Sequence, residues 1–179
     1  MLVAGVSHAA DDPAAGRVVY LSGTMHAQTP DNKTCILARH SSIYGGNVIS
    51  TEKCTVARIE FGDGSTLTLR PLSKVKIDSF AFDDAKPEKG RMRYSLLKSR
   101  PRAVTGLIGK HNRDAYRAST VTATIGIRGA RFGMLLCDGN EKEDPACLKT
   151  LEEAKDRQAG EPALVFDVEE NSIEVKNDA

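Results

Sequence analysis

The chain of 179 residues contains no tryptophan, and aromatic residues make up only 5% of it. Base-stacking surfaces and most cofactor pockets depend on aromatic side chains, so the sequence argues against nucleic-acid binding and indicates no cofactor. It also has no run of about 18 apolar residues, so a bilayer-spanning helix is not expected. With 40% hydrophobic and 27% charged residues, the composition is typical of one globular domain.

The net charge of +1 hides a strong asymmetry along the chain. Residues 1–137 carry 20 Lys and Arg against 11 Asp and Glu, whereas residues 138–179 carry 5 against 13. Two interpretations stay open: the acidic tail folds back over the basic middle, or the basic middle binds an envelope glycan, a lipid headgroup or an acidic partner. The side chains expected to form such an anion-binding face are Lys98, Arg100, Arg102, Lys110, Arg113 and Arg117.

The first residues are similar to the end of a secretory signal peptide. Leu2–Val6 is a short apolar run, and Ser7-His8-Ala9 has the small-x-small pattern cut by signal peptidase. The basic start and the longer apolar core of a full signal are missing. We therefore expect a signal-peptide remnant and flexible terminus over residues 1–15, with an ordinary flexible terminus as the alternative. The pattern predicts an exported chain, periplasmic or extracellular, with a single β domain over residues 16–179.

Four cysteines, Cys35, Cys54, Cys137 and Cys147, agree with export. Pairing Cys35 with Cys54 and Cys137 with Cys147 closes the shortest loops, and each bond would stabilise the fold by about 3 kcal/mol. A zinc site would favour a Cys-x-x-Cys spacing that the chain lacks. The acidic stretch 138–144 also departs from a calcium-binding loop, so we predict two disulfide bonds and no metal site.

Alternation of apolar and polar residues predicts strands along most of the chain. Residues 55–61 and 65–70 flank Gly62-Asp63-Gly64, a sequence that favours a tight hairpin turn. Residues 75–78 continue the alternation and predict a three-stranded meander, and residues 103–108 predict a further strand.

The C-terminal part changes character twice. Leu148, Leu151 and Ala154 have helical spacing within an insert at about 138–161. Residues 163–168 and 172–176 then predict a closing hairpin. Together these patterns predict an all-β fold, an antiparallel sandwich or a solenoid-like stack of short strands, with one short helix near the C-terminal end.

Several segments resemble the FecR domain, a periplasmic module named after an iron-citrate signalling regulator. The first is Ala-Thr-Ile-Gly-Ile-Arg-Gly at 123–129. Residues 61–67 resemble the family's Asp-Gly-Ser hairpin, and residues 94–98 and 102–108 resemble its central block. The similarity covers residues 43–136 best. It implies an exported, all-β, non-enzymatic domain that interacts with an envelope or outer-membrane protein.

The chain also departs from that family. Ala130 and Arg131 stand where the family usually has Thr and an acidic residue, and the cysteine-containing insert is not a family feature. Signalling members have a cytoplasmic segment that binds a sigma factor and a membrane helix, which we do not expect here. Two glycines three residues apart in a strand predict a bulge or tight corner. The motif residues expected to have structural roles are Asp63, Gly64, Gly126, Ile127, Arg128 and Gly129.

No motif indicates catalysis. The histidines are isolated, Ser41-Ser42 beside His40 has no third partner, and there is no phosphate loop or nucleophile elbow. The sequence therefore predicts no enzyme and no catalytic residue. Three functions stay open: a protein-interaction scaffold of the cell envelope, a glycan- or anion-binding envelope module, and a periplasmic component of cell-surface signalling. The oppositely charged ends also predict head-to-tail self-association.

Overall fold

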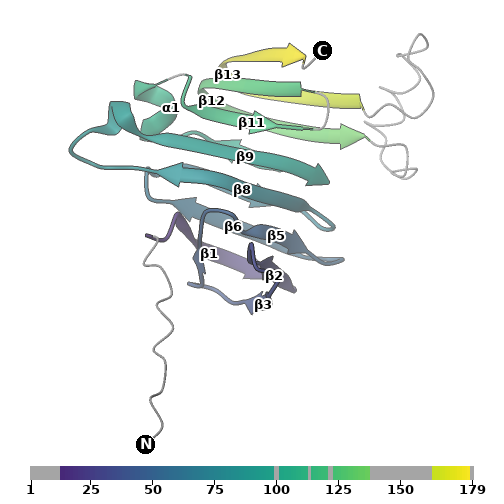
Figure 1. Cartoon of the computed structure of the whole chain (residues 1–179). Coiled ribbons are helices and arrows are strands. Elements are labelled where there is room, and N and C mark those ends of the chain that lie inside the picture. Colours follow the sequence, from purple (N-terminus) through teal and green to yellow (C-terminus); the bar gives the residue numbers. More distant parts are fainter. Residues whose placement is uncertain (1–12, 99–100, 113, 121–122, 138–162, 178–179) are drawn as a thin grey trace, which may run out of the picture.

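The computed structural model describes residues 13–98, 101–112, 114–120, 123–137 and 163–177 (Figure 1). Their regular elements are strands, apart from a 3-10 turn at Pro87–Lys89 and the helix α1 at Leu107–His111. The first seven strands are β1 Gly16–Ser22, β2 Met25–Gln28, β3 Thr34–Leu37, β4 Ser42–Ile43, β5 Val48–Thr51, β6 Val56–Phe61 and β7 Thr66–Leu69. The others are β8 Lys74–Ala81, β9 Arg91–Lys98, β10 Arg102–Val104, β11 Tyr116–Ser119, β12 Ala123–Cys137 and β13 Ala163–Asn177.

The strands form one hydrogen-bonded sheet that doubles over into two layers (Figure 1). The front layer has the order β3-β2-β5-β8-β9-β11, and the back layer has the order β10-β7-β6-β1-β4. The long strand β12 joins them, because its first half pairs with β11 and its second half with β10. The all-β sandwich expected from the sequence is confirmed.

The core lies between the two layers, where the period-two pattern places every second side chain. In β6, Ala57, Ile59 and Phe61 are buried while the residues between them are exposed. Phe61 of the back layer packs against Phe80 of the front layer, with ring centroids 5.7 Å apart. Each large apolar side chain buried in this way stabilises the fold by roughly 1.5–3 kcal/mol.

The predicted hairpin over Gly62–Gly64 is confirmed, since β6 pairs with β7. The third strand of the predicted meander is wrong, because β8 pairs with β5 and β9 of the front layer. The chain crosses between the layers just before it, where Leu72 has a φ of 58°. Thr51 holds this crossing: its Oγ donates to the carbonyl of Arg70 (2.7 Å) and accepts from the amide of Ser73 (3.0 Å). These bonds direct β8 away from β7.

Two other local predictions are also corrected. The closing hairpin is wrong, because residues 163–177 form one strand that follows β12 along its length. The strand predicted at 103–108 ends at Val104 and is followed by α1, after which β11 returns to the front layer parallel to β9.

The predicted signal remnant and the predicted helix in the insert fall largely on residues 1–12 and 138–162, outside the described residues. In the described part of the chain, no helix has the length and apolar character needed to cross a bilayer.

The predicted Cys35–Cys54 disulfide is wrong: both thiols are free and exposed. Cys35 on β3 lies opposite Ala27 on β2, which in turn lies opposite Ile49 on β5. Cys35 thus lies on the edge strand of the front layer, whereas Cys54 lies beyond β5, in the turn that leads to β6. Cys137 ends β12 and Cys147 lies outside the described residues, so the second bond stays a prediction.

Two tyrosines, Tyr94 of β9 and Tyr116 of β11, are wholly buried in the core and meet edge to face, with ring centroids 6.1 Å apart. Neither hydroxyl has a hydrogen-bond partner within the described residues. Burial raises the pKa of both phenols, and the nearby Asp63 carboxylate raises that of Tyr116 further. The folded chain therefore holds both phenols in the neutral form.

We expect these two phenols to ionise only when the chain unfolds in alkali. Their pKa is higher in the folded than in the unfolded chain, so their stabilising effect is complete below about pH 10 and is lost as the pH rises further. Titration followed by ultraviolet absorbance and circular dichroism should show a phenolate step that coincides with unfolding. A Tyr94→Phe, Tyr116→Phe double variant should lose that step and unfold at higher pH. Ionisation of all four tyrosines before any loss of structure would contradict this.

Candidate functional site

Two of the segments that resemble FecR motifs, residues 61–67 and 102–108, meet at the turn between β6 and β7. Asp63 lies in this turn and is buried, with 2% of its surface exposed. Its Oδ1 accepts hydrogen bonds from the Ser65 amide (3.0 Å) and the Ser65 hydroxyl (2.6 Å). Its Oδ2 accepts from the Ile108 amide (3.3 Å), and its backbone carbonyl accepts from Leu107 (2.9 Å). Asp63 therefore fixes both its own turn and the start of α1.

Gly106 allows this close approach between the turn and α1. A Cβ atom at Gly106 would lie 2.2 Å from the Asp63 carbonyl oxygen and 2.4 Å from the Ser65 nitrogen. Two residues before it, Val104 of β10 lies opposite Thr66 of β7 on one side and Arg131 of β12 on the other. The hairpin, the central block and the second half of β12 are thus direct neighbours.

The Ile-Gly-Ile-Arg-Gly segment lies where β12 passes from the front layer to the back layer. Gly126 lies opposite Arg117 of β11, and the side chain of Ile127 is buried. Arg128 lies opposite Ser172 of β13, and Gly129 follows it. The ladder with β13 changes register between Arg128 and Arg131. The segment therefore lies at the corner of the folded-over sheet.

The four predicted anion-binding residues that the structure describes are not brought together on one face. Lys98 and Arg117 belong to β9 and β11 of the front layer, and Lys110 lies on α1. Arg102 lies on β10 of the back layer. The other two predicted residues, Arg100 and Arg113, lie outside the described residues.

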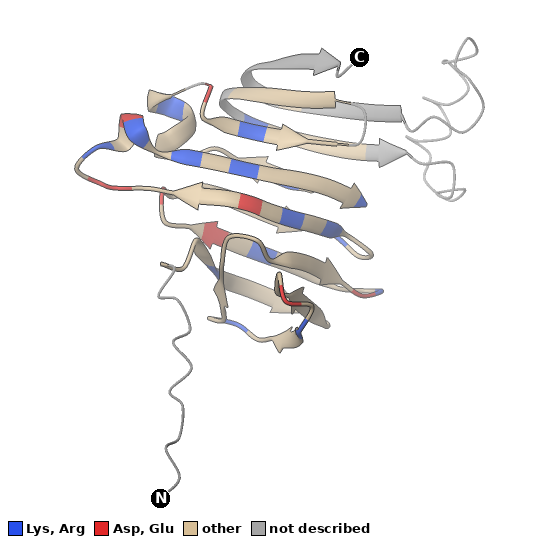
Figure 2. Cartoon of the chain, viewed as in Figure 1, with Lys and Arg blue, Asp and Glu red and all other residues tan. Residues whose placement is uncertain are grey.

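The structure instead groups a different basic set on the front layer (Figure 2). Arg91 and Arg93 of β9 are exposed, and Arg93 lies directly opposite Arg117 of β11. We call Arg91, Arg93 and Arg117 the arginine patch. The sequence carried a signal for it that was not used: in Arg91-Met92-Arg93-Tyr94, basic and apolar residues alternate with period two, which places both arginines on the outer face.

A hollow of about 430 Å³ adjoins the arginine patch. Arg91 and Arg93 line it from β9, and Lys89, Asn112 and Asp114 line it from the segments around α1. The Asn112 side-chain amide donates to the carbonyl of Glu88 (3.0 Å), which fixes one wall. The hollow therefore presents three cationic side chains and one carboxylate.

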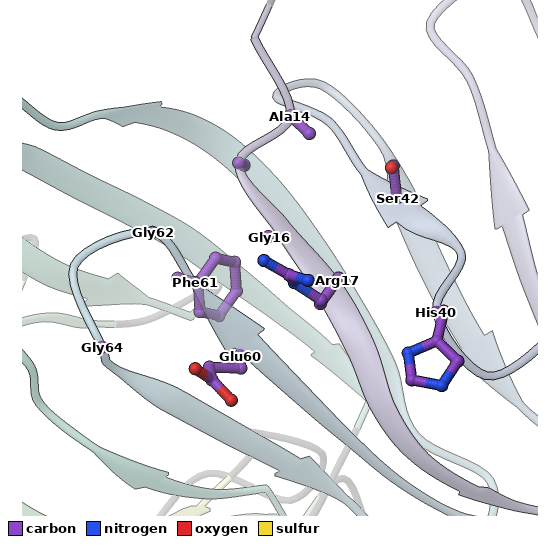
Figure 3. Close-up of a pocket in the computed structure, with 10 residues that line it drawn as sticks. Ala14, Gly16, Arg17, His40, Ser42, Glu60, Phe61, Gly62 and Gly64 are labelled. Carbon is purple, nitrogen blue, oxygen red and sulfur yellow. The ribbon is translucent and has the colours of Figure 1, made fainter.

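A second hollow, of about 370 Å³, opens beside β1 and β6 (Figure 3). Arg17 lies opposite Glu60 across the ladder and opposite Ser42 on its other side, and His40 lines the same hollow. All four residues are exposed, and no hydrogen bond joins the Ser42, His40 and Glu60 side chains in the described part of the chain. The described residues also contain no group of three potential metal ligands. The hollow therefore contains the serine, histidine and acidic residue of a hydrolytic triad, but these side chains do not make the hydrogen bonds that a triad requires.

No family model matches the chain, and no curated protein matches it. A solved structure described as a cell surface anchoring domain is similar to 36% of this chain and 84% of its own, with 23% sequence identity and a TM-score of 0.35. A likeness of that size carries no argument about function.

Proposed function

We propose that this chain is an exported, non-enzymatic interaction module of the cell envelope, built like a FecR domain. The observation that carries the proposal is the contact between two of the resembling segments, residues 61–67 and 102–108. The Asp63 carboxylate binds the first turn of α1, and β10 of the central block pairs with both β7 and β12. Asp63 and the backbone of β10 thus take part in building the fold, which supports a scaffold in preference to a reactive site.

Fewer observations support export than the four cysteines suggested. With Cys35 and Cys54 both free, the first predicted disulfide no longer argues for an oxidising compartment. Export rests on the small-x-small pattern before residue 10 and on the FecR resemblance.

Strand β3 is the element that we propose binds the partner. It ends the front layer, and no described strand pairs with its outer edge. Thr34, Cys35 and Ile36 are all exposed, and Ile36 is the most exposed large apolar side chain among the described residues, at 76%. An open edge with such a residue is a template for strand addition, in which the backbone gives affinity and the side chains give specificity. A partner strand would cover Ile36.

The test combines localisation with capture from the native envelope. We expect the chain in the exported fraction, and we expect one envelope protein to be recovered by the wild type and not by Ile36→Lys. Val56→Lys is the matched control. Val56 is also exposed, at 37%, but it lies on β6, which is paired on both sides with other strands of the back layer. Retention in the cytoplasm would refute export. Equal recovery by Ile36→Lys and the wild type would refute binding at β3.

A further inference from the structure

The arginine patch concentrates positive charge on neighbouring strands of the front layer. Met92, Tyr94, Tyr116 and Ala118 are buried, so the residues between them on β9 and β11 point to the outer face. Since β9 and β11 pair in parallel, Arg93 and Arg117 stand side by side on strands about 5 Å apart. Like charges in this position repel each other unless something neutralises them.

The side chains that the structure describes supply little neutralisation. Asp114 lines the adjoining hollow, but none of the described carboxylates lies within ion-pair distance of any of the three arginines. Asp78, on the adjacent β8, accepts a hydrogen bond from the Ser95 hydroxyl (2.6 Å) and pairs with Lys76 (3.5 Å). Arg117 donates its Nε–H to the carbonyl of Asp114 (2.8 Å), which orients the guanidinium and leaves its terminal N–H groups for a ligand.

We propose that the arginine patch and its adjoining hollow bind an acidic polysaccharide, through the carboxylates of neighbouring sugar units. Guanidinium groups form paired, charge-assisted hydrogen bonds with carboxylates, and adjacent arginines match charges that repeat along a polymer. Beside the patch, Ser95 of β9, Ser119 of β11 and Thr124 of β12 form a cross-strand row of hydroxyl residues. Such a row suits the hydroxyl groups of a sugar chain.

The composition of the outer face favours an acidic polysaccharide over a nucleic acid as the ligand. Single-stranded nucleic acids bind basic grooves that also offer aromatic side chains for stacking. The outward-pointing residues of β8, β9 and β11 in the described part of the chain include no aromatic residue. Phe80 of β8 packs against the core. The face therefore offers charge and hydroxyl groups without a stacking platform.

The proposal is independent of the β3 edge, and its test uses the full chain with polygalacturonate as the probe. We expect saturable binding that weakens as salt is added. An Arg91→Gln, Arg93→Gln variant, which removes two exposed charges without touching the core, should bind about tenfold or more weakly. Arg117→Gln should weaken binding similarly. An Arg58→Gln, Arg70→Gln variant is the matched control, since it removes the same charge from exposed positions outside the front layer and should bind as the wild type.

Three results would overturn the proposal. The first is no binding of polygalacturonate by the wild type at low salt. The second is equal weakening by the front-layer and control variants, which would indicate general charge attraction. The third is equal or tighter binding of poly-glutamate or single-stranded DNA, which would assign the patch to an acidic protein or a nucleic acid. Thermal unfolding of each variant establishes that the fold is intact. Binding by Arg91→Gln alone is also measured, because this variant tests the patch without changing Arg117.

Discussion

Replacing Gly106 with alanine is expected to destabilise the fold by about 4 kcal/mol, at the upper end for a single substitution. The new Cβ would lie 2.2 Å from the Asp63 carbonyl oxygen and 2.4 Å from the Ser65 nitrogen. Both neighbours are backbone atoms held in a hydrogen-bonded turn, so neither can move aside as a side chain would. Relief requires separating α1 from the β6–β7 turn, which breaks the bonds that Asp63 makes to Leu107 and Ile108.

Two other glycines provide matched controls for this measurement. At Gly45 no atom lies within 4 Å of the position that a Cβ would take, so Gly45→Ala should change the stability by no more than about 0.5 kcal/mol. Gly64 has equal space but a φ of +77°, so Gly64→Ala should cost about 1 kcal/mol from backbone strain alone. Denaturant unfolding of the three variants measures the differences. A Gly106→Ala cost no larger than that of Gly64→Ala would show that the turn and α1 are not packed as described.

Removing the Asp63 carboxylate is the second large effect, with an expected loss of about 3 kcal/mol for Asp63→Ala. The substitution leaves the Ser65 amide and hydroxyl and the Ile108 amide buried without their acceptor. Each unsatisfied buried donor costs roughly 1–3 kcal/mol, offset in part by relaxation and water entry. Asp63→Asn keeps the shape and one acceptor oxygen, so it should cost about half as much.

Asp83 is the matched control for Asp63. Its Oδ1 also accepts from an amide two residues ahead, that of Ala85 (2.9 Å), but in an exposed turn. Asp83→Ala should therefore cost well under about 1 kcal/mol, because water replaces the lost acceptor. Hydrogen exchange adds a local measure: Asp63→Ala should lower the protection of the Ile108 amide, and Asp83→Ala should leave it unchanged. Equal losses of stability in the two variants would contradict the role assigned to Asp63.

The sequence determined the local structure well where a short pattern has only one stable outcome. Alternation such as that of Ala57, Ile59 and Phe61 can bury one face only as a strand, so the fold class followed from it. Gly62-Asp63-Gly64 determined its hairpin because a tight turn depends on residues that are adjacent in sequence.

Strand pairing was decided only by the tertiary structure. An alternating segment such as β8 satisfies its pattern equally well beside β7 or beside β5, and the crossing held by Thr51 selects β5. The same limit explains the failed disulfide, since loop length does not show that Cys35 lies on the edge strand β3 and Cys54 in the turn between β5 and β6.

For the candidate site, too, the sequence determined one part and the tertiary structure decided the other. Lys98 and Arg102 are close in sequence but lie on different layers, whereas Arg93 and Arg117 are 24 positions apart and stand side by side. Composition determined that the middle of the chain is basic. Which of those charges share a face depends on long-range hydrogen-bond registers, whose energies come from contacts between distant segments, and only the folded sheet decides them.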